Sequence, residues 1–347
     1  MSRIFVPGKL PFFLLFIFIV LGVYAGAAAD NYLNAVSVNQ NFSVHSIETF
    51  DYERDIDGSA SDGKRPSQGP PSRAELVMKA FASAYPERMG PAQFRGGDWA
   101  VFLGGQWYYY AEGRLLPETH RNRVAEYSVL PFYNYAAELP PWTAPTLEES
   151  ERMRGMMERR QEQSRSTVQR STHFFDALWR THNRDESWDR VKSMKFLGHT
   201  VMMHYSILTQ LSLVEEMILA EAKTNTEVKR WIDSIGTVEG WSWRNISQSQ
   251  SRSYHSYGAA IDLLPRSLGG LATYWLWSAQ NNQEWWAIPY NRRYHPPKEV
   301  IKAFESMGFV WGGKWTVYDT MHFEYRPEIL VLSGLPLTDH QSFFSAR

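Results

Sequence analysis

Residues 251–265 read SRSYHSYGAAIDLLP and place His255 seven positions before Asp262. The end of this stretch has the composition of a strand, in which side chains alternate between two faces. Asp262 then shares a face with the small Ala260, while larger apolar side chains point the other way. His255 precedes Gly258, on a turn that can fold the imidazole back over the carboxylate. The stretch therefore either supplies two ligands of a metal ion or is a turn that leads into a strand with polar residues.

A second stretch, YDTMHFEYRPEI at residues 318–329, contains the groups that would complete a site. His322 and Glu324 alternate with apolar residues, which predicts a strand with His322 on its polar face. Asp319 comes three residues earlier, at the turn that enters this strand. A carboxylate there can face a metal without binding it and can move a proton between water and a leaving amine. We interpret Glu324 as a partner of a ligand rather than a ligand.

The chain has no cysteine, which excludes disulfides, thiol catalysis, zinc fingers and iron–sulfur clusters. Metal ligands must therefore be His, Asp or Glu. Catalytic zinc usually takes three protein ligands and keeps one position for water. His255 and Asp262 need a third partner, and His322 is the best candidate.

These motifs resemble those of a known family. SYHSYGAAID, from Ser253 to Asp262, is similar to the S-x-H-x-x-G-x-A-x-D signature of zinc D,D-carboxypeptidases and L-alanyl-D-glutamate endopeptidases, which include VanY-like enzymes and some phage endolysins. DTMHFE, at residues 319–324, resembles the second family motif, an acidic residue three positions before a histidine. Many members have Trp or Pro where this chain has Met321, a position that we expect to face away from the metal. The resemblance covers roughly residues 195–332.

The resemblance implies that His255, Asp262 and His322 bind zinc and that Asp319 is the catalytic acid/base. Substrates of such enzymes carry carboxylates, so a cation should face the site. Arg244 precedes the first motif on a predicted strand, and an arginine in a comparable place holds a substrate carboxylate in the family. Its bidentate fork suits that role. The alternative is Arg252, which with Ser253 lies nearest the expected substrate, where specificity is set.

The N-terminus predicts export. MSRIFVPGK carries Arg3 and Lys9, an uncharged apolar run follows, and Ala27 and Ala29 fit a cleavage pattern before Asp30. This order is typical of a secretory signal. The alternative is an uncleaved membrane anchor, because the run approaches the roughly 20 residues that span a bilayer. Either outcome places the remaining chain in the periplasm or outside the cell, anchored to the membrane only if the segment is not cleaved.

The spacing of apolar residues predicts helices and strands in the remaining chain. Helices are predicted over 74–89, 146–166, 200–222 and 226–236, and the second has a capping box of Thr146 and Glu149. A β-hairpin is predicted over 98–117, with its turn at Gly104 and Gly105. Short strands are predicted at 240–246, 259–264, 308–312 and 321–327. Helices before a cluster of short strands predict an α+β fold, in which a small antiparallel sheet with packed helices carries the zinc site after a small hairpin-containing region.

Three further histidines are assigned from their neighbours in the sequence. His199 and His204 fall in a predicted helix and are interpreted as structural, and His295 is placed in a loop near the cleft. The predicted division of the chain is a signal or anchor at 1–29, a polar segment and linker at 30–74, an accessory region at 75–145, a charged solvated helical connector at 146–190, a zinc peptidase domain at 191–335 and a tail at 336–347.

Composition limits the partners. The 347 residues are 44% hydrophobic and 21% charged, a globular profile, with 36 basic and 37 acidic side chains. A net charge of -1 gives no electrostatic reason to bind nucleic acid or an anionic membrane. Aromatic residues make up 15% of the chain, and most of those in residues 274–294 are expected to pack in a core rather than to line a cleft wall.

The sequence therefore predicts an exported zinc metallopeptidase that acts on peptidoglycan peptides, most similar to a D-alanyl-D-alanine carboxypeptidase. A lysostaphin-like endopeptidase is disfavoured because such enzymes use an H-x-H pair, where this chain has His322, Phe323 and Glu324. The alternative of another class is a non-catalytic zinc-containing cell-wall-binding or signalling module on the same scaffold. Asp319 argues against that alternative. The sequence does not choose between carboxypeptidase and endopeptidase, and it does not predict the oligomeric state.

Overall fold

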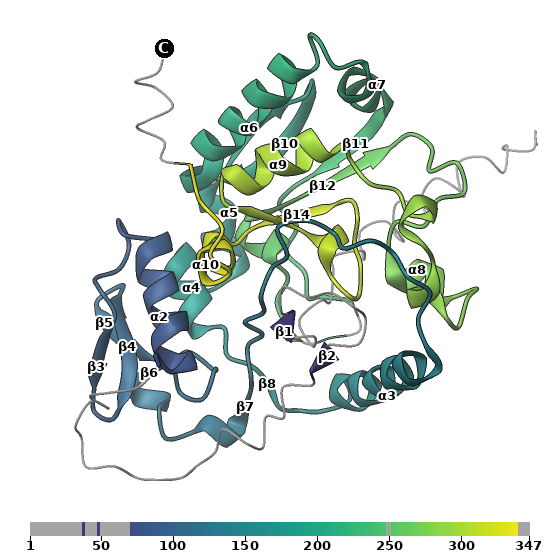
Figure 1. The fold of residues 1–347 in the computed structure, drawn as a ribbon. Coiled ribbons are helices and arrows are strands. Elements are labelled where there is room, and N and C mark those ends of the chain that lie inside the picture. The colour runs from purple at the N-terminus through teal and green to yellow at the C-terminus, as the bar shows by residue number, and fades with distance from the viewer. Residues whose placement is uncertain (1–36, 39–46, 49–69, 248, 250, 339–347) are drawn as a thin grey trace, which may run out of the picture.

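A four-stranded antiparallel sheet in the order β11-β12-β14-β13 frames the C-terminal part of the chain (Figure 1). The computed structural model describes residues 37–38, 47–48, 70–247, 249 and 251–338. The predicted signal or anchor at 1–29 lies outside these residues. The strands of this sheet are β11 (Ile235–Glu239), β12 (Ala260–Pro265), β13 (Phe309–Trp311) and β14 (His322–Tyr325).

Helices pack around this sheet, and an aromatic cluster lies beside it. α9 packs on α6 and on β13, and α10 follows directly after β14. Tyr274, Trp275 and Trp285 are buried in a second cluster with Met153 of α3, so core packing was the right expectation for these rings. The elements are α6 (Leu208–Glu221), α7 (Thr226–Ser234), η6 (Tyr254–Tyr257), α8 (Trp275–Ala279), η7 (Trp285–Ala287), η8 (Tyr290–Arg292), α9 (Lys298–Ser306), η9 (Gly312–Lys314) and α10 (Pro327–Leu332).

The accessory region contains a second antiparallel sheet, in the order β3-β4-β5-β6, with α2 packed against β4. The predicted hairpin is confirmed, because β4 pairs with β5 around Gly104 and Gly105, both at positive φ. The elements are α2 (Arg73–Ala84), β3 (Gln93–Arg95), β4 (Asp98–Leu103), β5 (Gln106–Tyr109), β6 (Leu116–Pro117), η3 (Glu118–His120), η4 (Val124–Glu126) and β7 (Tyr127–Ser128).

Between the two sheets the chain forms α3 and several short elements. The capping box is confirmed: Thr146 accepts from the Glu149 backbone, and the Glu149 side chain accepts from the Thr146 backbone. α3 is not solvated on all sides, since Met153 and Arg160 are buried against the aromatic cluster. The elements are α3 (Leu147–Ser164), β8 (Gln169–Arg170), α4 (His173–Trp179), α5 (Arg184–Arg190), β9 (Val191–Phe196), β10 (His199–His204) and η5 (Tyr205–Ile207), and the short pair β1 (Ser37–Val38) and β2 (Ile47–Glu48) precedes them all.

Two predicted elements are wrong. His199 and His204 lie in strand β10, not in a helix, because Leu197 and Gly198 form a positive-φ turn that pairs β10 with β9. The predicted strand at 240–246 is a loop with one isolated bridge between Asn245 and Arg252, and the Arg244 backbone N–H bonds to the Ser256 side chain. The overall class is nevertheless α+β, as the sequence predicted.

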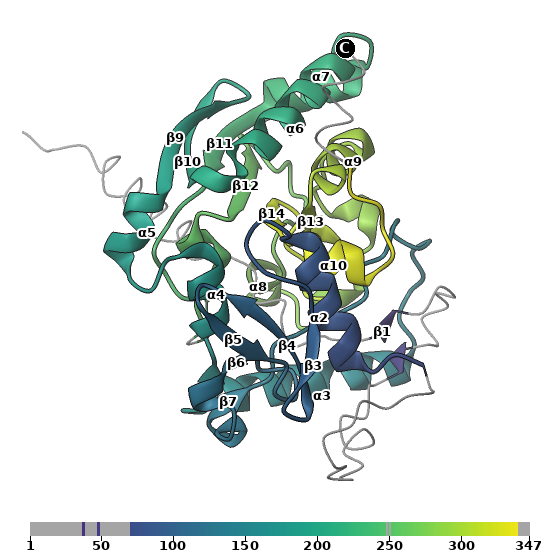
Figure 2. The same ribbon diagram turned by 90° about the vertical axis from the view of Figure 1, so that its left-hand side faces the viewer.

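One hydrophobic cluster runs from the accessory region into the C-terminal part. It includes Phe81 of α2 and Val101 of β4 together with Ile261 of β12 and Ile329 of α10. Figure 2 shows α2 lying beside α10, and these two helices are in extensive contact. The two sheets therefore share a single core. Among the described residues, no helix has the length and apolar character needed to cross a bilayer.

Candidate metal centre

Two candidate ligands come from neighbouring strands of the C-terminal sheet. Asp262 of β12 and His322 of β14 are direct partners in the antiparallel register. Directly opposed residues point their side chains to the same face of a sheet, only a few ångströms apart. Pairing therefore brings together two residues that are 60 positions apart in the sequence.

His255 reaches the same point from η6. Ser253 begins this helical turn, and its hydroxyl accepts from the His255 backbone. Gly258 ends it in the left-handed conformation at φ +67° and returns the chain into β12. A Cβ on Gly258 would lie 2.7 Å from Val191 and 2.8 Å from the backbone nitrogen of His204. Glycine is therefore required here by both conformation and space.

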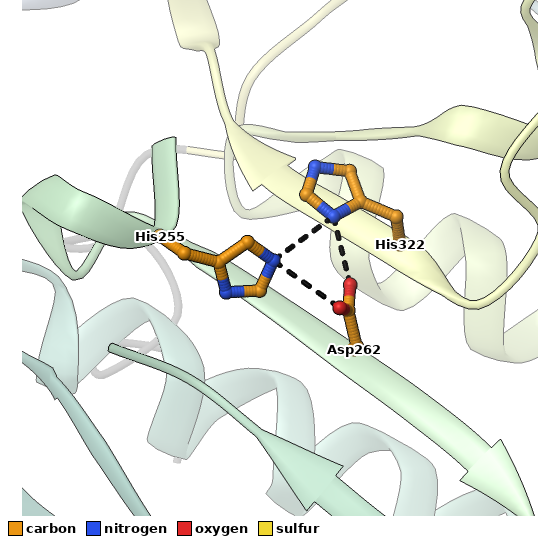
Figure 3. A group of neighbouring side chains, drawn as sticks. All are labelled: His255, Asp262 and His322. Atoms are coloured by element: carbon orange, nitrogen blue, oxygen red, sulfur yellow. Dashed lines mark hydrogen bonds and ion pairs between the residues drawn. The ribbon is translucent and has the colours of Figure 1, made fainter. Parts of the chain in front are cut away.

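The three side chains converge, as Figure 3 shows. His255 Nε2 lies 3.3 Å from the Asp262 carboxylate and 3.3 Å from His322 Nδ1. His322 Nδ1 lies 2.8 Å from the other Asp262 oxygen. One ligand atom from each residue lies within 4.8 Å of the others, and all three residues are buried. Two imidazole nitrogens and a carboxylate oxygen form a donor set that suits zinc.

Each imidazole is oriented through its second nitrogen. His255 Nδ1 bonds to the Gly240 carbonyl at 2.5 Å, and His322 Nε2 bonds to Glu324 at 3.3 Å. Such partners fix the tautomer, so that the nitrogen facing the other ligands carries a free lone pair. Glu324 thus has the supporting position expected from the sequence.

The electrostatics of the cluster favour a cation. Burial alone would lower the pKa of His322, but the Asp262 carboxylate, with help from Glu324, raises that pKa to about 10. Burial alone would raise the pKa of Asp262, but His255 and His322 hold it below its ordinary value. The buried carboxylate therefore demands a positive charge beside it, which a bound metal ion also provides. The residues present fit the zinc that the family resemblance implies.

Asp319 lies in the turn before β14, where its backbone N–H bonds to the Gly312 carbonyl at 3.0 Å. The residue is fully buried, and neither carboxylate oxygen has a side-chain hydrogen-bond partner among the described residues. Burial raises its pKa well above the ordinary value, and the Asp262 charge acts in the same direction. A buried carboxylate without a side-chain partner is costly, which points to a functional reason for it.

Arg244 faces the cluster from the loop after β11. Its Nη2 lies 4.0 Å from the Asp262 carboxylate. Its Nε and Nη1 atoms are buried and have no hydrogen-bond partner in the described part of the chain. The guanidinium therefore has donors to spare beside the cluster, and charge-assisted hydrogen bonds to a carboxylate are among the strong ones.

The other two predicted substrate residues make structural contacts. Arg252 forms an ion pair with Asp176, bonds to the Thr181 carbonyl at 3.1 Å and lines a cleft beside Tyr254. Ser253 is 1% exposed and caps η6. A substrate contact for Arg252 or Ser253 stays a prediction from the sequence. His295 is exposed in the loop before α9.

Sequence reasoning missed two neighbours of the cluster. The Gly240 carbonyl holds His255, and the Trp315 ring lies 5.6 Å from the His322 ring between centroids. Neither contact has a local signal, because each depends on how distant loops close over the sheet. Gly240 itself must be glycine, because a Cβ at this position would lie 2.3 Å from the Met202 carbonyl oxygen.

Comparisons with known proteins give matches to two family models. Residues 77–132 match the model of a domain family of unknown function. No curated protein and no solved structure matches the chain. Residues 247–325, which contain all three converging side chains and Asp319, match the family model described as D-alanyl-D-alanine carboxypeptidase.

Proposed function

We propose that this protein is an exported zinc metallopeptidase that hydrolyses peptide bonds in peptidoglycan stem peptides, most like a D-alanyl-D-alanine carboxypeptidase. The observation that carries the proposal is the convergence of His255, Asp262 and His322, together with the buried carboxylate of Asp319, which has no side-chain hydrogen-bond partner among the described residues. The match of residues 247–325 to the carboxypeptidase family model supports the same reaction class. Export rests on the N-terminal sequence alone.

His255, Asp262 and His322 would hold the metal ion, which when bound supplies Lewis-acid polarisation of a carbonyl and lowers the pKa of water. Asp319 accepts the proton of the attacking water and then donates it to the leaving amine. Its raised pKa fits a group that must hold a proton between these steps. Arg244, whose Nε and Nη1 have no hydrogen-bond partner among the described residues, binds the substrate carboxylate and orients the scissile bond.

The first test measures metal and product together. The full chain is analysed for bound zinc and incubated with purified muropeptides, and the products are identified by mass spectrometry. We expect one zinc per chain and loss of a single terminal alanine. Release of a larger stem fragment would identify an endopeptidase instead. Zinc without hydrolysis would favour the non-catalytic module, and absence of stoichiometric zinc would remove the site itself.

The second test isolates Asp319. Asp319→Asn keeps the side-chain shape but removes the proton acceptor, so we expect unchanged zinc content and about a 10²- to 10⁴-fold loss of kcat/KM. Asp98→Asn is the matched control, because Asp98 is a largely buried carboxylate that accepts from backbone N–H groups in the accessory region. Full hydrolysis by Asp319→Asn would refute its role as acid/base.

A further inference from the structure

A line of buried charged side chains begins at His322 and leads away from the other ligands. Glu324 accepts from His322 Nε2 with one oxygen, and its second oxygen accepts from Arg326 Nη1 at 3.2 Å. Arg326 Nε in turn donates to Glu328. Glu324, Arg326 and Glu328 are each 1% exposed.

The line ends in the accessory region. The hydroxyl of Tyr85 donates to the second Glu328 oxygen at 3.0 Å, across 243 positions of sequence. Tyr85 is the residue at which α2 ends, and it is 5% exposed. It belongs to the segment that matches the domain family of unknown function. Four consecutive contacts thus connect this segment to a candidate metal ligand.

A second contact links His322 to the accessory side of the chain. The Trp315 indole donates to the Tyr133 hydroxyl at 2.8 Å, and the Trp315 ring lies against the His322 ring. Tyr133 directly follows the matched segment 77–132. Because α2 also packs on α10, the accessory region contacts the strand and helix that carry the whole line.

The charges explain why each member is needed. Glu324 contacts His322 Nε2, and a buried carboxylate requires a partner of opposite charge. Arg326 provides that charge but divides it between Glu324 and Glu328. Tyr85 fixes the position of Glu328 and thereby determines how Arg326 is shared. Without the Tyr85 hydroxyl, Glu328 would be free to shift, and Arg326, Glu324 and the His322 ring would shift with it.

We infer that Tyr85, Arg326 and Glu328 are positioning residues for His322, so that the accessory region sets the affinity of the metal centre. The inference rests on the proposed metal site. It assigns to segment 77–132 a role in completing the centre rather than in binding a separate partner. Tyr85 acts through three intermediate side chains and touches neither metal nor substrate.

The experiment compares two tyrosine variants of the full chain. Tyr85→Phe removes the hydroxyl at the end of the line and keeps the buried ring. Tyr135→Phe is the matched control, because the buried Tyr135 hydroxyl also donates to a carboxylate, Glu305, that pairs with Lys314 and contacts no candidate ligand. Zinc affinity is measured by competition with a chromophoric chelator, and ligand geometry is measured from the visible absorption of the cobalt-substituted protein.

Direct partners of metal ligands change metal affinity by about 10- to 100-fold, and Tyr85 lies further away, so we expect about 3- to 10-fold weaker zinc binding in Tyr85→Phe. Its cobalt spectrum should shift, whereas Tyr135→Phe should match the wild type in both measurements. Glu328→Gln, which removes one of the two carboxylates that hold Arg326 in place, should also weaken binding by about 3- to 10-fold. This second variant keeps the test decisive if Tyr85→Phe does not fold.

The outcomes separate the two proposals. Wild-type protein that binds neither zinc nor cobalt would refute the proposed function. Wild-type protein that binds both, with Tyr85→Phe and Glu328→Gln indistinguishable from Tyr135→Phe, would refute only the positioning role. Arg326→Met is avoided, because it would leave two buried carboxylates without their guanidinium.

Discussion

Replacing Gly258 by alanine tests how tightly η6 must turn to bring His255 over β12. The substitution meets two separate costs. At φ +67°, an alanine adopts the left-handed conformation, which costs about 1–2 kcal/mol. Its Cβ would also lie 2.7 Å from Val191 Cγ1 and 2.8 Å from the His204 backbone nitrogen. The His204 amide cannot move aside freely, because it donates to the Gly258 carbonyl at 2.9 Å.

Overpacking of this kind costs about 1–3 kcal/mol. Added to the backbone strain, the expected loss in the free energy of unfolding is about 2–5 kcal/mol for Gly258→Ala. Gly198→Ala is the control, since Gly198 has φ +83° but nothing within 4 Å of an added Cβ. It should lose only the backbone cost, about 1–2 kcal/mol.

Both variants are unfolded in urea at pH 7 with a chelator present, so that metal binding to the folded state does not contribute to the comparison. The difference between the variants then measures the steric cost alone, about 1–3 kcal/mol. Equal losses for Gly258→Ala and Gly198→Ala would refute the claim that β10 closes directly against the turn of η6.

Three further predictions follow from other contacts. Burial lowers the pKa of His204 from its ordinary 6.5 to about 3, so this residue stabilises the fold above pH 6.5 and loses that contribution as the pH falls toward 3. Between pH 7 and pH 5 the loss is about 2 kcal/mol in urea unfolding and should be absent from His204→Gln. Thr146→Ala removes the cap of α3 and should cost about 1 kcal/mol by the same assay, with no change in metal content. Lys314→Met leaves the half-buried Glu305 without its cation and should cost about 1–3 kcal/mol, measured by thermal and urea unfolding; an unchanged stability would refute a stabilising role for this ion pair.

The sequence predicted the centre better than its surroundings. His255, Asp262 and His322 were identified because chemistry-bearing residues stood at fixed offsets from a glycine turn and on alternating strand positions. Local patterns also gave α2, the β4–β5 hairpin and the capped start of α3. For α2, the β4–β5 hairpin and the start of α3, the contacts that determine the structure lie within a few residues of one another.

The wrongly predicted segments are determined by turns and long-range contacts that leave no periodic pattern in the sequence. An apolar run that continues from β10 into α6 has no break in hydrophobicity, and only the Leu197–Gly198 turn places His204 in a strand. Arg244 was assigned to a strand because its aromatic neighbours favour one, yet its backbone pairs with a serine side chain twelve residues away. The contact from Tyr85 to Glu328 spans most of the chain and leaves no periodic signal at either end.

The order of the candidate ligands along the chain determines when the centre can assemble. A chain synthesised as far as the end of β12 already contains His255 and Asp262, but its third ligand arrives with β14 and the supporting Glu328 with α10. The first contributor, Tyr85, is made long before the last. A nascent or C-terminally truncated chain therefore holds an incomplete candidate centre, and under the proposed function metal capture coincides with completion of the fold rather than with the appearance of its first motif.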